Sequence, residues 1–223
     1  MSDLRKCFLM MMLGCLLLTI SCQEEEQEII DPTIDNTIPQ SSQLVGLMKN
    51  IVTHDGSFDD IVDGGNCFSI NLPYMIIRNS EPLVINKIED YNQLQVSDNI
   101  QIQFPITITR DDHVSEIIEN DAALRNLADT CQIEDEDIEC VDFVYPFRFA
   151  TYDSNNNIIG TTEVFHDAQV FGFMGNLNAN TVVAINYPIR LLLSNGEFLD
   201  IAHNTDLLSG ILAFQASCEE NDG

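Results

Sequence analysis

One short pattern occurs four times in this sequence, and it limits the possible fold more than any other feature. In each copy, five apolar or aromatic residues stand two positions apart, and a proline follows the third of them. The copies cover residues 68–76, 100–108, 141–149 and 183–191. Strict alternation is typical of a β-strand with one buried face. We therefore expect each copy to form one strand of a common β core.

The prolines of the four copies are Pro73, Pro105, Pro146 and Pro188. Proline has no backbone N–H to donate to a ladder, so it belongs at an edge strand or a bulge. By parity, each proline lies on the face opposite to the five apolar residues. We expect sheets with one face covered by helices and one face that is more polar.

Each copy is followed by a polar turn, a second short strand and a segment that is predicted to be helical. The helices are expected at 86–95, 120–130 and 207–214, while Gly172 and Gly175 weaken the helix of the third unit. This order predicts an α+β fold with four strand–strand–helix (ββα) units. We expect the units to pair into two similar ββαββα domains with antiparallel sheets. The alternative is an all-β sandwich in which the predicted helices are loops.

The cysteine positions indicate how the units pair. Cys67 and Cys140 directly precede the first alternating residue of units one and three, and Cys131 and Cys218 follow the helices of units two and four. This symmetry favours disulfides Cys67–Cys131 and Cys140–Cys218 within domains 67–131 and 140–218, although four cysteines allow three pairings. The spacing contains no CxxC motif, so a zinc site is not expected.

The N-terminus has the features of an export signal. Arg5 and Lys6 precede an apolar run, 8–20, which is too short to span a bilayer comfortably and which ends at Ser21-Cys22. A small residue before cysteine resembles the lipobox of bacterial lipoproteins, although Thr19 stands where leucine is usual. The resemblance implies that 1–21 is a signal peptide and that Cys22 is acylated, with fatty acids such as palmitate. Cys15 after Gly14 is a second candidate, and an ordinary secretory signal is the alternative.

An acidic tract, 23–26, follows Cys22 directly. It resembles the surface-export signal of Bacteroidota lipoproteins, and the alternative is that it only begins a solvated tether. Composition predicts a flexible acidic tether over 22–43. The remaining boundaries are a short helix and acidic loop at 44–66, an acidic linker at 132–139 and a tail at 219–223.

The formal net charge of the 223-residue chain is −27. Such a charge opposes binding to nucleic acid and to anionic lipid headgroups. We therefore exclude nucleic acid as a partner, whereas divalent cations and cationic partners remain open.

Asp153, Asn155 and Asn157 place oxygen-bearing side chains at alternate positions, as at the start of a calcium loop. Ile158 stands where the loop requires glycine, and a polar hairpin tip uses the same residue types for its backbone. Two further acidic groups lie at 55–63 and 134–139. Runs of charge are usually solvated faces, so no cofactor is expected, and calcium is the ion left open.

The sequence contains few signs of catalysis. None of the four histidines pairs with another at ligand spacing, and the GxSxG motif of α/β-hydrolases is absent. His203 and Asp206 are the candidate acid–base pair, but the sequence shows no residue to orient them. Tryptophan is absent. Three phenylalanines, Phe165, Phe171 and Phe173, break the pattern of buried rings in the third unit. Relaxed constraint in this diverged unit is the favoured interpretation, and a ligand site is the alternative.

The lipobox, the acidic tract and the C-x5-P strand openings resemble flavobacterial-type surface lipoproteins of Bacteroidota with duplicated ββα repeats. The resemblance implies an outer-membrane protein held by a lipid anchor, exposed on the cell surface or, alternatively, facing the periplasm. It implies no activity. We expect a non-catalytic binding or structural module with a protein or glycan partner. The alternatives are a surface hydrolase of polysaccharide or protein and a calcium-stabilised adhesin.

Overall fold

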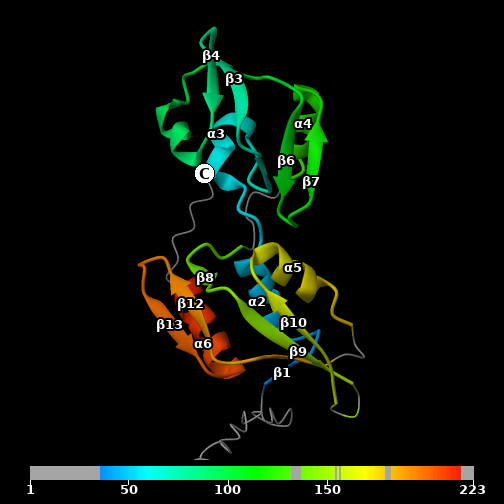
Figure 1. Cartoon of the computed structure of the whole chain (residues 1–223). Helices are drawn as coiled ribbons and strands as arrows, with labels where there is room; N and C mark the ends of the chain where they lie inside the picture. Colours follow the sequence, from blue (N-terminus) through cyan, green and yellow to red (C-terminus); the bar gives the residue numbers. More distant parts are fainter. Residues whose placement is uncertain (1–35, 132–136, 154, 156, 179–181, 217–223) are drawn as a thin grey trace, which may run out of the picture. The chain divides into compact units, whose positions relative to one another are not determined.

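The structure is a computed structural model that describes residues 36–131, 137–153, 155, 157–178 and 182–216. The expected signal peptide, the expected acylation site Cys22 and most of the tether lie outside the described residues, as does Cys218. The described residues form helices and four small sheets, in which all paired strands are antiparallel (Figure 1). The protein is therefore α+β, and its helices contradict the all-β alternative.

The elements follow in chain order, with η marking a 3-10 helix. The first part of the chain contains β1 (Thr37–Ile38), α2 (Gln43–Ile51), η1 (Ser57–Asp59), α3 (Asp60–Asp63), β2 (Phe68–Ile70), β3 (Tyr74–Arg78), β4 (Glu81–Ile85), η2 (Ile88–Gln93), β5 (Ile100–Ile102), β6 (Ile106–Arg110), β7 (Ser115–Ile118) and α4 (Asp121–Ala128). The second part contains β8 (Val141–Phe143), β9 (Phe147–Tyr152), β10 (Ile158–Val164), α5 (Asp167–Gly175), β11 (Val182–Ile185), β12 (Ile189–Leu193), β13 (Phe198–Ile201) and α6 (Asn204–Gln215).

The prediction of four continuous strands was wrong, because each strand is divided at its proline. β2 ends at Ile70 and β3 begins at Tyr74, directly after Pro73, and the other three copies are divided in the same way. Proline cannot donate to a ladder, so it cannot continue the pairing. All four X-Pro bonds are cis: Leu72–Pro73, Phe104–Pro105, Tyr145–Pro146 and Tyr187–Pro188. The alternation of buried residues was predicted correctly, since both strands of each copy bury its apolar side chains.

The two strands on either side of a proline lie in different sheets. β2 pairs with β6 while β3 pairs with β5, so the first and second copies exchange their leading strands. The third and fourth copies do the same, because β8 pairs with β12 and β11 pairs with β9. The sheets have the orders β2-β6-β7, β4-β3-β5, β13-β12-β8 and β1-β11-β9-β10.

Reciprocal backbone hydrogen bonds join the copies beside the prolines. The amide of Asn71 donates to the carbonyl of Thr107 at 2.8 Å, and the amide of Gln103 donates to the carbonyl of Met75 at 2.9 Å. The third and fourth copies contain the same pair of bonds, from Val144 to Arg190 at 3.0 Å and from Asn186 to Arg148 at 2.8 Å. Each donor stands two residues before one proline, and its acceptor stands two residues after the other.

The described residues pack around two main hydrophobic cores. The first contains residues of α3 to α4, including Phe68, Ile108 and Leu124. The second contains residues of β8 to α6 together with β1 and α2. This membership of β1 and α2 was not predicted from the sequence.

β1 corrects the expected extent of the tether. Thr37 and Ile38 were assigned to the flexible tether, yet they pair with Ala184 and Val183 of β11. The helix expected within 44–66 is present as α2, and Ser42 caps it by accepting a hydrogen bond from the amide of Leu44. The helix expected at 86–95 is instead the 3-10 helix η2, whereas the third unit keeps its helix, α5, despite its glycines. Within the described residues, no helix is long and apolar enough to cross a membrane.

Cys67 and Cys131 form a disulfide, one of the two bonds that the cysteine positions favour. It joins the residue before β2 to the chain just after α4. The other favoured bond, Cys140–Cys218, stays a prediction because Cys218 is outside the described residues.

Removal of the Cys67–Cys131 bond is expected to destabilise the protein. The bond closes a loop with a sequence separation of 64 residues, and loss of such a constraint on the unfolded chain typically costs about 2–5 kcal/mol. The double variant Cys67→Ser, Cys131→Ser should lower the free energy of unfolding by this amount, measured by urea denaturation of residues 36–223. A variant that unfolds at the same urea concentration as the native protein would contradict this expectation.

Candidate metal centre

Three acidic side chains from distant parts of the sequence come together in the structure. Asp55, Asp137 and Glu139 can each offer one carboxylate oxygen, and these oxygens lie within 4.8 Å of one another. The sequence had indicated the acidic groups 55–63 and 134–139 separately, without relating them. The structure joins one member of the first group to two of the second.

Ile138, the buried residue between Asp137 and Glu139, holds these two acids in position. Ile138 is buried in the same core as the apolar face of α2, and its amide donates to the carbonyl of Asn50 at 3.0 Å. Asp137 and Glu139 therefore flank an anchored residue. Asp137 is 7% exposed. Asp55 follows α2 in the chain, and its Oδ1 accepts hydrogen bonds from the amide and the hydroxyl of Ser57.

The three acids line a cavity of about 230 Å³. Its other polar walls include Asp142, Asp167, His54 and His113. Burial and the nearby Asp167 raise the pKa of Asp142. Several carboxylates facing one small space repel one another unless protons or a cation reduce their charge. Calcium prefers oxygen ligands such as these, six to eight in number, so water would have to complete its coordination.

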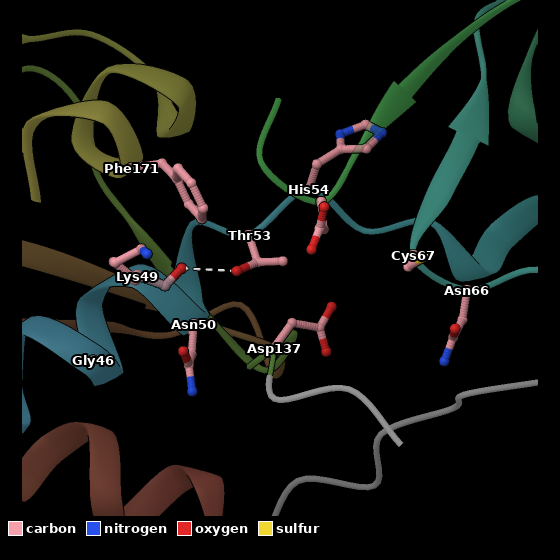
Figure 2. Close-up of a pocket in the computed structure, with 10 residues that line it drawn as sticks. Gly46, Lys49, Asn50, Thr53, His54, Asn66, Cys67, Asp137 and Phe171 are labelled. Carbon is pink, nitrogen blue, oxygen red and sulfur yellow. Dashed lines mark hydrogen bonds between the residues drawn. The ribbon is translucent and has the colours of Figure 1, made fainter. Parts of the chain in front are cut away.

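Asp137 also lines a neighbouring cavity of about 500 Å³, which Figure 2 shows. Lys49, Asn50 and Thr53 come from α2 and the turn after it, and Phe171 comes from α5. Thr53 donates its hydroxyl proton to the carbonyl of Lys49 at 3.0 Å (Figure 2). The Lys49 ammonium lies 4.6 Å from the centre of the Phe171 ring, so a cation already covers this aromatic surface.

The two histidines bind the surrounding scaffold rather than the acids. The ring of His54 points away from Asp137 in Figure 2, and its Nε2 lies 2.7 Å from the hydroxyl of Ser69. The Nε2 of His113 donates to the carbonyl of Val52 at 2.6 Å. Burial, followed by the neighbouring His113, lowers the pKa of His54 and favours the neutral ring. The carboxylates are therefore the ligands that this site offers.

The contact between His54 and Ser69 superficially resembles a nucleophile beside its base. Ser69 is 3% exposed and lies in the pleated strand β2, directly opposite Thr109 of β6. A nucleophile that attacks a polymer needs an exposed position on a sharp turn. The contact therefore favours a structural role for both side chains.

Asp153, the first residue of the calcium loop considered from the sequence, instead stabilises the turn of a hairpin. Oδ1 of Asp153 accepts hydrogen bonds from the amides of Asn155 and Asn157 at 2.8 and 2.9 Å. The hydrogen bonds from Asn157 contribute most to lowering the pKa of Asp153. The three residues occupy the connection between β9 and β10, as the polar-turn interpretation requires.

The remaining sequence candidates lie in structural positions. Asp206 donates its amide to the carbonyl of His203 at 3.1 Å, so the two residues meet through their backbones at the start of α6. Phe173 stacks on Phe149 with ring centres 4.3 Å apart, and Phe171 contacts His113. Phe165 is the exposed one of the three phenylalanines.

No protein-family model, curated protein or solved structure matches this chain.

Calcium is expected to stabilise the native protein if Asp55, Asp137 and Glu139 bind it. Saturation at a hundred times the dissociation constant adds about 2.7 kcal/mol, which corresponds to a rise of about 5–10 °C in melting temperature for a chain of this size. We expect Glu139→Gln to reduce the rise and the control Asp153→Asn to retain it. The measurement is thermal denaturation of residues 36–223 with millimolar calcium, with chelator, and with sodium at matched ionic strength. An equal rise in both variants would exclude this cluster as the source.

Proposed function

We propose that the protein is a lipid-anchored protein of the outer membrane that acts as a non-catalytic binding or structural module on the cell surface. The basic residues, the apolar run and Ser21-Cys22 support acylation of Cys22, and the acidic tract 23–26 supports surface export of a Bacteroidota-type lipoprotein. A periplasmic orientation is the alternative. A protein or a glycan is the expected partner.

We further infer that the body of the protein consists of four ββα units paired into two similar domains, 67–131 and 140–218. The reciprocal hydrogen bonds beside the prolines support this pairing, because the same donor and acceptor positions recur in both halves. The Cys67–Cys131 bond supports the first domain, since it links unit one to the end of unit two.

The later two units share a further contact that supports their common origin. The tyrosine before each proline donates its hydroxyl proton to the first residue of the helix that follows in the same unit. Tyr145 donates to Asp167 of α5 at 2.6 Å, and Tyr187 donates to Asn204 of α6 at 2.7 Å. Each tyrosine thereby fixes the start of a helix to the point where the strand is divided.

The observation that carries the non-catalytic proposal is the use of the reactive side chains by the scaffold. His54 contacts a buried serine, His113 donates to a backbone carbonyl, and Tyr145 and Tyr187 hold helix termini. General acid–base or nucleophilic catalysis requires such groups to face a substrate. A repeated scaffold that binds a partner fits these contacts better.

The acidic cluster favours a second candidate function, a calcium-stabilised adhesin. Asp55 lies after α2, whereas Asp137 and Glu139 precede β8. A divalent cation on these oxygens would fasten two segments of the chain to each other and reduce their repulsion. The calcium-dependent melt described above tests this candidate.

Anchoring is testable through the acylated cysteine. In Cys22→Ser, we expect loss of palmitate incorporation and transfer of the protein from the membrane fraction to the soluble fraction, because a serine cannot carry the thioether-linked lipid. Cys15→Ser is the matched control, and it should remain in the membrane fraction. Labelling of intact cells with an impermeant amine reagent then distinguishes the cell surface from the periplasm. Continued membrane retention of Cys22→Ser would contradict the proposal.

A further inference from the structure

Two aspartates lie completely buried in the first core. Asp59 ends η1 and Asp63 ends α3, and both are 0% exposed. Residues four apart in a helical segment share one side of it, so the two carboxyl groups project in the same direction. Carboxylates are seldom fully buried unless they are paired with a cation.

Each carboxyl group has one satisfied and one unsatisfied oxygen. Oδ2 of Asp59 accepts a hydrogen bond from the amide of Ile70 in β2 at 2.8 Å, and Oδ1 of Asp63 accepts one from the amide of Gly65 at 3.1 Å. Oδ1 of Asp59 and Oδ2 of Asp63 are buried without a hydrogen bond. An ionised carboxylate in this position would carry a large desolvation cost.

Two tyrosines complete the cluster. Tyr74 of β3 donates its hydroxyl proton to the hydroxyl of Tyr91 in η2 at 3.1 Å. Burial is the largest cause of the raised pKa of both tyrosines, and charge on Asp59 and on Asp63 raises both further. The hydroxyl of Tyr91 also lies near the carboxyl group of Asp59, and this contact raises the pKa of the tyrosine as well.

The charged groups around the cluster do not neutralise it. Asp55 and Asp60, from the same segment, add negative charge. The positive charge of Arg125 in α4 offsets part of the rise in the pKa of Asp63, of which burial is the largest cause. Its guanidinium, however, donates to the backbone carbonyl of Asp63 at 3.3 Å and pairs with the side chain of Asp121. Within the described part of the chain, no lysine or arginine forms an ion pair with the carboxylate of Asp59 or Asp63.

A bound proton removes the charge repulsion between the two carboxyl groups more simply than a metal ion would. Metal ions need several ligands, whereas the cluster offers two carboxyl oxygens and two neutral hydroxyl groups. A proton on one carboxyl group removes one charge and supplies a donor for the unsatisfied oxygen of the other. Two carboxyl groups that share a buried site cannot both ionise easily.

We propose that Asp59 and Asp63 form a proton-binding pair that fastens η1 and α3 to β2. The pair holds a proton while Asp59 accepts from Ile70, and loss of that proton leaves two buried negative charges that favour release of the segment. Release would expose Phe58 and Val62, which now pack in the first core. It would also change a cavity of about 730 Å³ lined by Ile61, Gly64 and Val96.

The direction of the pH effect follows from the two aspartates. Burial raises the pKa of Asp59 from 3.8 to about 7, and burial followed by the charge of Asp59 raises the pKa of Asp63 as well. The folded state therefore binds more protons than the unfolded state above about pH 4. The free energy of unfolding from this pair is fully present below that pH. It is lost as the pH rises through the folded-state pKa values, about 7 for Asp59 and about 9 for Asp63.

The direct test is an NMR titration of the aspartate carboxyl carbons in residues 36–223, between pH 3 and 9 and in the presence of chelator. We expect at least one of Asp59 and Asp63 to titrate with a midpoint above pH 6. If both carboxyl groups titrate below pH 5, the proposal is wrong. If millimolar calcium shifts their resonances at pH 7 in Glu139→Gln, which removes a ligand of the separate Asp55 cluster, the pair binds a cation and the proposal is also wrong.

The pH dependence of unfolding, measured for the wild-type protein and its variants, tests the proposal without an NMR assignment. Between pH 5.5 and 7, the ratio of folded to unfolded wild-type protein should fall by up to about tenfold per pH unit for each of the two carboxyl groups that holds a proton. Asp59→Asn and Asp63→Asn should each flatten this dependence, and the control Asp153→Asn, which lies in the β9–β10 hairpin, should preserve it. If one variant does not fold, the other decides. An unchanged pH dependence in the variant that folds would overturn the proposal.

Discussion

The fold depends on how the chain replaces the hydrogen bonds that its four prolines interrupt. Each proline divides one strand into two, and the two parts join different sheets. The amide two residues before one proline then donates to the carbonyl two residues after the proline of the paired copy. Because this bond is made in both directions, neither copy completes its sheets without the other. A pair of copies is thus the smallest assembly in which these ladders are completed.

Much of this could be predicted from the sequence, because alternation reports burial. The buried parity, the α+β class and the helices α2, α4 and α6 follow from residue spacing. The spacing leaves the helix α5 open, because Gly172 and Gly175 weaken the pattern there. The exchange of strands could not be predicted. Alternation shows which side of a strand is buried, but it does not identify the neighbouring strand. The same limit hid the pairing of Thr37 with Ala184, since a strand of two residues is too short to show a periodic signal.

The acidic residues illustrate a second limit. The segment 55–63 reads as a turn-rich acidic loop, yet Asp59 and Asp63 are buried whereas Asp55 lies beside Asp137 and Glu139. Neighbouring aspartates of one segment therefore occupy two different environments. The sequence signal that was available is the spacing of Asp59 and Asp63, which is four residues and matches that of Phe58 and Val62. When apolar and acidic residues both recur at helical spacing, either side of the segment can be buried. Composition alone does not reveal which side packs against the core.

The measurement that tests the central account most directly is native-state amide hydrogen exchange, followed by NMR. The amides to observe are those of Asn71, Gln103, Val144 and Asn186, the four donors beside the prolines. If reciprocal bonding holds the paired units together, both donors of a pair should be protected, and both should exchange through the same cooperative opening. Exchange of one donor at the rate of an exposed loop while its partner stays protected would show that the bonds are not coupled, and would contradict the account.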